Sequence, residues 1–271
     1  MPRRRDNPIA LIAAGLLTLA GCRAAPGEAP DERADPAMLD TATPDRAQVG
    51  LMTSLPLYWA EGTGVADLAA GRAAVPWQRA AIEARYRIVP LDTLSPIPAL
   101  SPDEPEVDPL ADLDRLAVIQ PRGLSPADNV ALDAWVRAGG RLLLVLDPAL
   151  TGKYDCPLGD PRRPVDSALI PPVVKHWGLN IFYPVFENPD ALPVESRIGS
   201  GGIVPLEAPG TIDFDPQAGT RCTIMRSNAI ATCQVGTGRV TLIADAALFE
   251  HSELAGEDGA TLRAVLAASL R

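Results

Sequence analysis

The segment from Leu113 to Pro148 constrains the fold of this chain more than any other part of the sequence. It contains an apolar strand at 113–121, a helix, and a second strand at 141–148. The second strand, RLLLVLDP, is almost continuously apolar, as parallel strands buried on both faces tend to be. A strand, a helix and a strand joined by short turns indicate a mostly parallel sheet.

The helix between these two strands has clear start and stop signals. Ser125 suits the N-cap, Pro126 suits the first helical position, and Asp128 completes a variant of the capping box. Gly139 and Gly140 then end the helix. Its apolar side is expected to face the core through Val130, Leu132, Ala134, Trp135 and Val136.

Strands and helices alternate along the rest of the chain. The sequence predicts strands at 48–57, 87–94, 180–187 and 238–245, and helices at 75–86, 167–179 and 258–270. This order predicts an α/β fold, a three-layer sandwich around a mostly parallel sheet with an antiparallel hairpin insert. We expect one domain from residue 49 to residue 271, because single domains commonly reach this size.

Two stretches resemble the auxiliary domain of gliding-motility-type ABC transport systems. Residues 49–148 have the opening strand with SLP, the Trp-led helix, the YRIVP strand, and PRGLSP before a helix that ends in Gly-Gly. Residues 236–250, GTGRVTLIADAALFE, resemble the strand that closes related glutamine-amidotransferase-like domains. The resemblance implies a flavodoxin- or glutamine-amidotransferase-like domain outside the membrane that assists a transporter or motility complex.

The first 22 residues have the order of features found in bacterial lipoprotein signals. Arg3, Arg4 and Arg5 are followed by the apolar run IALIAAGLLTLA, which is shorter than the roughly 20 residues needed to span a bilayer. LAGC, ending at Cys22, resembles the lipobox, which implies cleavage before this residue and its acylation, including with palmitate. An ordinary secretory signal with an incidental Cys is the alternative.

The segment after Cys22 is expected to connect a lipid anchor to the domain. Residues 22–48 are rich in Pro, Ala and charge, which predicts a disordered tether. The resemblance to lipoproteins implies a protein that faces the periplasm. Inner-membrane lipoproteins often carry Asp after the lipidated Cys, so Arg23 favours the outer membrane over the inner one.

The charge balance limits the partners that the sequence predicts. The chain has a formal net charge of −10, and residues 1–21 hold three Arg and one Asp, a net +2. Removing residues 1–21 therefore leaves a chain near −12, which disfavours nucleic acid and an anionic leaflet as partners. No later segment is long and apolar enough to span a bilayer, so the lipid is the only predicted membrane anchor.

The cysteines indicate an oxidising compartment. If Ser227 and Asn228 form a tight turn, cross-strand partners are residues whose numbers sum to 455, and Cys222 then lies opposite Cys233. Such neighbours can be joined by a disulfide, and two reduced core cysteines are the alternative. Cys156 is left without a partner, either as a reactive thiol or as an ordinary loop residue.

Polar residues near the ends of apolar strands are the candidates for a ligand site. Asp147 and Asp245 each end such a strand, and Ser54 and Gln120 lie near the ends of two others. Ligands bind at the carboxyl edge of the sheet in folds of this kind, so these four residues are predicted to line one rim. The alternative is that each Asp fixes a turn.

Patterns for catalysis or metal binding are weak. A glutamine-amidotransferase-type reaction needs a Cys on a tight elbow, with a His and an acid, whereas Cys156 lies in a loop. We expect His176 to be a partly buried structural residue, and His251 to cap a turn or face solvent. There is no Gly-x-Ser-x-Gly motif and no metal-ligand spacing. We therefore predict no catalytic residues, no metal and no cofactor.

Residues 149–164 follow Asp147 and are rich in Gly, Pro and charges of both signs. We predict a mobile surface loop over the carboxyl edge that recognises a partner. Arg162 and Arg163 have the chemistry to hold a carboxylate or phosphate, and a solvated loop is the alternative.

These features together predict a lipid-anchored, periplasm-facing, non-enzymatic binding or assembly protein of an envelope complex. Its expected partners are the membrane, through the lipid, and envelope proteins that include ABC transporter components. The alternative is a hydrolase or small-ligand sensor that uses the carboxyl edge around Asp147 and Asp245.

Overall fold

A computed structural model describes residues 46–271, except residue 102 and residues 184–193 and 199–201. The described residues from Arg46 onward belong to one compact unit. The predicted signal peptide, Cys22 and nearly all of the predicted tether lie outside the described residues. Among the residues that are described, no helix has the length and apolar character to cross a membrane.

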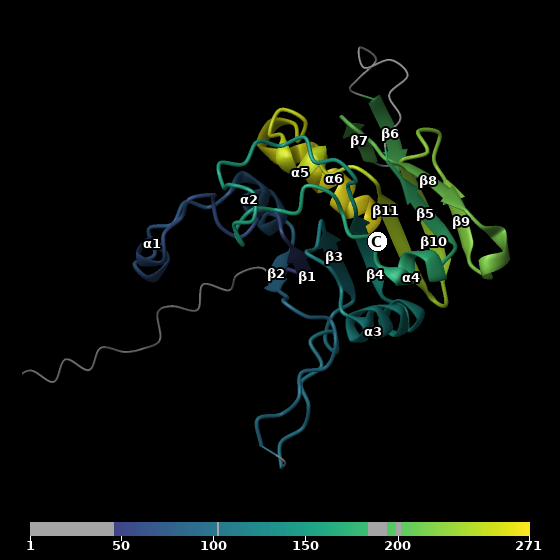
Figure 1. The fold of residues 1–271 in the computed structure, drawn as a ribbon, viewed down its shortest axis with the longest axis horizontal. Coiled ribbons are helices and arrows are strands. Elements are labelled where there is room, and N and C mark those ends of the chain that lie inside the picture. Colours follow the sequence, from purple (N-terminus) through teal and green to yellow (C-terminus); the bar gives the residue numbers. More distant parts are fainter. Residues whose placement is uncertain (1–45, 102, 184–193, 199–201) are drawn as a thin grey trace, which may run out of the picture. The chain divides into compact units, whose positions relative to one another are not determined.

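A seven-stranded sheet in the order β2-β1-β3-β4-β11-β10-β9 forms the centre of this unit (Figure 1). Its strands are β1 Gln48–Thr53, β2 Arg87–Pro90, β3 Arg115–Ile119, β4 Arg141–Val145, β9 Arg221–Ile224, β10 Ile230–Val235 and β11 Gly238–Ile243. The first five strands of that order are parallel; β10 then pairs antiparallel with β11, and β9 pairs antiparallel with β10 and so runs in the same direction as β11. The predicted α/β fold with a mostly parallel sheet and an antiparallel hairpin is confirmed.

Helices cover both faces of the sheet (Figure 1). One face packs under α2 Trp77–Glu83, α5 Ala247–Glu250, α6 Ala260–Ser269 and the hairpin of β6 Val194–Ile198 and β7 Gly202–Leu206. The other face packs under α3 Pro126–Arg137, α4 Pro172–His176 and the pair of β5 Leu179–Phe182 and β8 Thr211–Phe214. The remaining elements are α1 Val65–Ala69 and two 3-10 turns, Pro216–Ala218 and Glu257–Gly259.

The apolar strands at the centre explain this layering. Leu116 and Val118 of β3 enter the core on the α3 side, whereas Ala117 and Ile119 enter the core on the α6 side. Because successive residues of a strand point to opposite faces, a continuous apolar run requires cover on both. The capping box that begins α3 is present as predicted, with reciprocal hydrogen bonds between Ser125 and Asp128.

Some predicted details were wrong. Val130 does not face the core, since it is 71% exposed, whereas Leu132 and Val136 are fully buried. Val130 precedes Leu132 by two positions, which places the two side chains on opposite sides of a helix. The helix predicted at 167–179 is only α4, because Pro171 and Pro172 allow it to begin no earlier.

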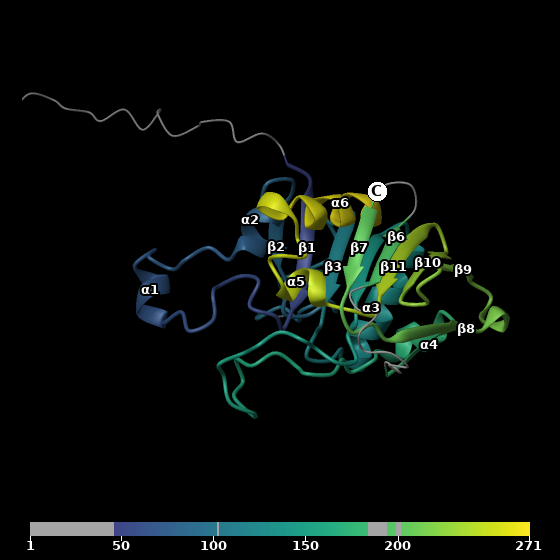
Figure 2. The same ribbon diagram turned by 90° about the horizontal axis from the view of Figure 1, so that it is seen from above.

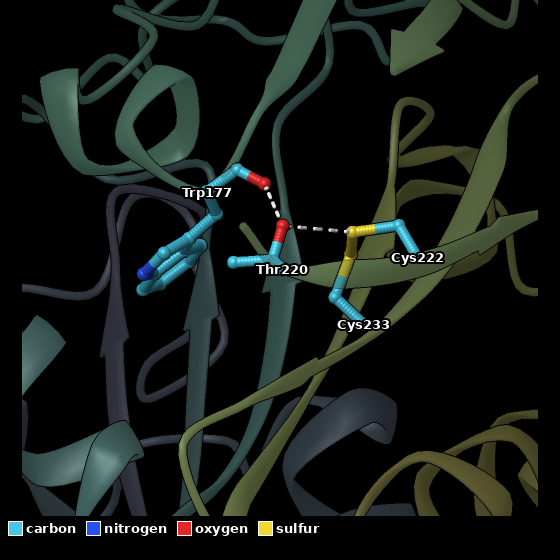
Figure 3. Close-up of a disulfide and its surroundings, with 4 residues drawn as sticks. All are labelled: Trp177, Thr220, Cys222 and Cys233. Carbon is cyan, nitrogen blue, oxygen red and sulfur yellow. Dashed lines mark hydrogen bonds between the residues drawn. A yellow bond between two sulfur atoms is a disulfide. The ribbon is translucent and has the colours of Figure 1, made fainter. Parts of the chain in front are cut away.

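The predicted disulfide is confirmed. Cys222 and Cys233 are cross-strand partners in β9 and β10, with Cα atoms 4.0 Å apart and a bond between their sulfur atoms. Thr220 lies beside this disulfide and donates a hydrogen bond to the carbonyl oxygen of Trp177, a fully buried side chain (Figure 3). The disulfide therefore joins the edge strand β9 to β10, and the hydrogen bond from Thr220 connects the start of β9 to the end of α4.

We expect the variant Cys222→Ala/Cys233→Ala to lose about 2 kcal/mol of unfolding free energy. A disulfide stabilises a protein by lowering the conformational entropy of the unfolded chain, and a short closed loop lowers it only modestly. Urea unfolding measures the loss, with Cys156→Ala as the control that should change little. Non-reducing peptide mapping of protein from the periplasm should show the linked pair. Two free thiols there would contradict the account.

Candidate functional site

Ser54 and Gln120 lie where β1 and β3 end, and both are buried. The Gln120 amide nitrogen donates to the carbonyl oxygens of Asp147 and Val165, each at 3.0 Å, and its amide oxygen accepts from the Asp147 N–H at 2.8 Å. Ser54 Oγ donates to the Gln120 carbonyl oxygen at 2.5 Å. Gln120 also has a positive φ of 44°, which is uncommon for a residue with a side chain. These two side chains join strand ends to the loop that follows β4.

Asp147 follows β4 and is 1% exposed. Its Oδ1 accepts from the Ala149 N–H at 2.7 Å, and its Oδ2 accepts from the Ala246 N–H at 2.8 Å. The first bond fixes the turn from strand to loop, as the sequence predicts. The second bond connects the end of β4 to the end of β11, which the sequence does not indicate.

Asp245 follows β11, the neighbour of β4, and is 2% exposed. Its Oδ2 accepts from the N–H groups of Glu207 and Ala208 at 2.9 and 3.0 Å. Its Oδ1 accepts from the Ala247 N–H at 2.8 Å, which fixes the turn into α5. The structure thus places all four predicted rim residues at the carboxyl edge, with their polar atoms bonded to backbone groups.

Both aspartates have pKa values well above the ordinary value of a carboxyl group. Burial, together with the charge of Asp245, raises the pKa of Asp147 to about 7. Burial also raises the pKa of Asp245 to about 6, with a smaller contribution from Glu250 and against the effect of its backbone hydrogen bonds. A carboxyl in this range can be protonated near neutral pH, although the low exposure of both leaves little access for a ligand.

A second polar cluster at the same edge centres on Glu250, the last residue of α5. Its Oε1 accepts from Tyr154 Oη at 2.6 Å and from the Gly152 N–H at 3.0 Å, and its Oε2 accepts from the Thr151 N–H at 3.2 Å. Burial and the nearby Glu250 carboxylate raise the pKa of Tyr154. The start of the loop at 149–164 is therefore fastened to α5.

His251 extends this cluster. Its Nε2 lies 2.8 Å from Thr151 Oγ1 and 2.9 Å from the Glu207 carboxylate, and Thr151 Oγ1 also donates to Glu207 at 3.0 Å. His251 is the C-cap residue of α5, in line with the prediction that it caps a turn, but its side chain is 21% exposed and does not simply face solvent. The adjacent Glu250 and His251, shortly after the strand that ends at Asp245, are the sequence signal that could have found this cluster.

His176 was also predicted incorrectly. It was expected to be partly buried, but its side chain is 64% exposed. It ends the short helix α4, whose buried side is formed by Val173 and Val174. The imidazole therefore lies near Arg137 and Asp133 on the outside of α3.

The loop at 149–164 has no helix or strand, in line with its composition. Arg162 is exposed and binds the Asp160 carboxylate with two nitrogen atoms, at 3.0 and 2.7 Å. Arg163 is 21% exposed, and it donates to the carbonyl oxygens of Tyr154 and Cys156 and to Asp166. Arg163 therefore holds the loop together, while Arg162 is the more accessible of the two predicted partner residues.

An apolar groove lies on the outer side of α3, away from the carboxyl-edge residues. Its volume is about 960 Å³, and its lining includes Pro96, Leu110, Val130, Ala131, Ala134 and Trp135. Next to it, Ile97 and Val107 pair across the neighbouring loop and are 46% and 60% exposed. The sequence does not reveal this groove, because it depends on how the loop before β3 packs against α3.

No family model and no curated protein matches the chain. Solved structures resemble it distantly: exo-β-1,4-mannosidase Op5Man5 from Opitutaceae bacterium strain TAV5 is 15% identical with a TM-score of 0.43, covering 83% of this chain and 36% of the mannosidase. The cold-adapted β-galactosidase from Rahnella sp. R3 is 12% identical with a TM-score of 0.42, covering 82% and 30%. Cytoplasmic protein STM1381 from Salmonella typhimurium LT2 is 9% identical with a TM-score of 0.41, covering 83% and 100%. Likenesses this distant support no conclusion about activity.

Metal ligands are not grouped in the part of the chain that the structure describes. Within residues 46–271 and outside the gaps, no set of three or more His, Cys, Asp or Glu side chains is placed to hold a metal ion.

Proposed function

We propose that this protein is a lipid-anchored, periplasm-facing binding or assembly module of an envelope complex, and that it is not an enzyme. The anchor is the lipidated Cys22. The partner surface is the apolar groove on α3, which we call the α3 groove. An ABC transport system is the first complex to test, on the resemblance of residues 49–148 and 236–250.

The observation that carries this proposal is the contrast between the two surfaces. At the carboxyl edge, Asp147 and Asp245 are almost fully buried and bonded to backbone N–H groups. On α3, the well-formed groove is open and Val130 at its wall is 71% exposed. Exposed apolar surface of this kind commonly marks a protein–protein contact.

Charge gives the α3 groove a preference among partners. Asp108 and Asp114 line it, and the loop at 103–114 contains six acidic residues and no basic residue. An amphipathic helix with an apolar stripe and flanking Lys or Arg side chains would match both the apolar lining and the acidic rim.

The parallel strand order supports the finer fold type. The parallel strands follow the order β2-β1-β3-β4-β11, in which β11 is the fifth parallel strand along the chain. This is the 2-1-3-4-5 order of flavodoxin-like sheets. We therefore propose a flavodoxin- or glutamine-amidotransferase-like fold.

We expect Val130→Asp to abolish the capture of envelope partners while it leaves the unfolding free energy within about 0.5 kcal/mol, because the side chain is exposed. Chemical cross-linking in the host membrane, followed by purification and mass spectrometry, measures the capture. Val65→Asp is the matched control, since Val65 is 82% exposed and lies on α1, outside the groove. Equal cross-linked partners in all three proteins would refute the role of the groove.

A hydrolase or small-ligand sensor at the carboxyl edge is the second candidate. The observation that favours it is the pKa of about 7 for Asp147, a suitable value for proton transfer near neutral pH. Asp147→Asn tests it directly. If the wild type turns over an ester, amide or glycoside substrate and a folded Asp147→Asn variant does not, this candidate replaces the binding module.

A further inference from the structure

Arginines mark the edge of the sheet at which the parallel strands begin. Four strands start with an arginine and β11 has one at its second position: Arg87, Arg115, Arg141, Arg221 and Arg239. The opposite edge carries Asp147 and Asp245. The residues near the two ends of the strands therefore differ in kind, basic at one edge and acidic at the other, although the chain as a whole is acidic.

Four of these arginines form one row across neighbouring strands. Arg115 pairs with Arg141, and Arg141 pairs with Arg239. Gln234 of β10 is then the partner of both Arg239 and Arg221. Paired residues in a sheet point to the same face, so these four side chains share one face. We call Arg115, Arg141, Arg239 and Arg221 the arginine row.

Two cavities lie where α6 ends at this edge. The first, about 350 Å³, is lined by Arg46, Arg85, Arg115 and Arg271 and by residues near the end of α6. The second, about 300 Å³, is lined by Arg221 and Arg239 and also reaches α6. No acidic side chain lines either cavity, so each is a basic recess that suits an anion.

Few carboxylates oppose the arginine row. Arg115 lies 3.9 Å from Asp114, whose side chain is 83% exposed. For Arg141, Arg221 and Arg239, no carboxylate among the described residues comes within 4.0 Å. Arg221 and Arg239 are exposed, whereas Arg141 is half-buried and Arg115 is half-buried with its Nε bonded to the Leu270 carbonyl oxygen. Among the described residues, the charge of the row therefore has little carboxylate opposing it, and its accessible part lies at Arg221 and Arg239.

The chain enters the domain at this same edge. β1 runs parallel to its neighbours, so its start at Gln48 lies with theirs, and Arg46 just before it lines the first cavity. The end of the chain lies at this edge as well, where Figure 2 marks it C. The segment that contains Cys22 therefore joins the domain beside the arginines.

We propose that this amino edge docks on anionic lipid headgroups, with the arginine row bound to their phosphates. The proposal rests on the lipid anchor proposed at Cys22, because a tether that joins the domain at this edge would keep the edge within reach of the bilayer. Docking then directs the carboxyl edge, with the loop at 149–164, away from the membrane. The net charge of the chain argues against an anionic leaflet, but charges on one edge act locally because salt screens the distant ones.

Vesicle sedimentation tests this docking without the anchor. The protein is residues 22–271 with Cys22→Ser, which contains every described helix and strand, at an ionic strength of about 0.15 M, where the screening length is about 8 Å. We expect it to bind phosphatidylcholine vesicles that contain 30% phosphatidylglycerol, which makes their surface anionic. We expect no binding to vesicles of pure phosphatidylcholine. The triple variant Arg141→Gln/Arg221→Gln/Arg239→Gln should bind on the order of a hundredfold more weakly, since each basic residue near such a surface contributes about fivefold.

A matched triple variant controls for net charge. Arg72, Arg122 and Arg226 are exposed and lie outside both arginine-lined cavities, and their replacement by Gln should weaken binding less than threefold. Equal weakening by both triples, equal binding to both vesicle types, or release of the protein by millimolar inorganic phosphate alone would overturn the proposal. Because the assay uses unlipidated protein, its failure is distinguishable from failure of the anchor, which acylation of Cys22 reports separately.

Discussion

Asp147→Ala is expected to cost about 2–4 kcal/mol of unfolding free energy at pH 5. The change leaves the N–H groups of Ala149 and Ala246 without their acceptors, and a buried donor without a partner costs about 1–3 kcal/mol. Ala246 is fully buried, so water cannot replace the lost carboxyl there. The expected cost exceeds that of a simple turn cap, because Asp147 also joins the ends of β4 and β11.

Urea unfolding measures this cost, with Asp155→Ala as the control. Asp155 is exposed in the same loop, so its removal should change the unfolding free energy by less than about 0.5 kcal/mol. A fully stable Asp147→Ala variant that loses a measurable turnover would contradict our account, because Asp147 would then serve chemistry and not the fold.

The second large effect is a loss of stability as the pH rises from about 4 to 7. The pKa of Asp147 is about 7 in the folded protein, raised by burial, against an ordinary value near 4. Folding therefore favours the protonated carboxyl, and this contribution is complete below the unfolded pKa and lost as the pH passes the folded one. A shift of this size corresponds to at most about 4 kcal/mol. Asp245, with a pKa of about 6, acts in the same direction.

Unfolding free energies of the wild type and Asp147→Asn from pH 4 to 7.5 test this effect. The wild type should lose stability across the window, while the variant, which cannot ionise at this position, should follow a flatter curve. Parallel curves for the two proteins would show that Asp147 does not titrate in this range.

The sequence predicted the parts of the fold that depend on neighbouring residues. The segment at 113–148 was sufficient for β3, α3 and β4, because strand periodicity, the Ser125 cap and the double glycine are local signals. The disulfide could also be predicted from the sequence, because the position of a hairpin turn fixes the register of the two strands and so places Cys222 opposite Cys233.

Features that depend on distant contacts could not be predicted in this way. Thr151 and Glu250 are 99 positions apart, and only the adjacency of β4 and β11 brings them together. The arginine row likewise requires the order of the strands, which the sequence alone does not give. The β6–β7 hairpin was not predicted at all.

The candidate site illustrates the same limit. That Asp147 and Asp245 lie at one edge followed from their positions at strand ends. That their oxygens bond to the backbone of loops, including Glu207 and Ala208, required the packed structure. The sequence therefore located these residues but could not distinguish a ligand rim from a set of loop supports.

Acylation of Cys22 tests the central claim, a lipid-anchored module, most directly. Cells that express the wild type and the variant Cys22→Ser are grown with labelled palmitate, and the purified proteins are compared. We predict label in the wild type, none in Cys22→Ser, and a wild-type mass that lacks residues 1–21. Equal labelling of the two proteins, or an unlabelled wild type that retains residues 1–21, would contradict the account.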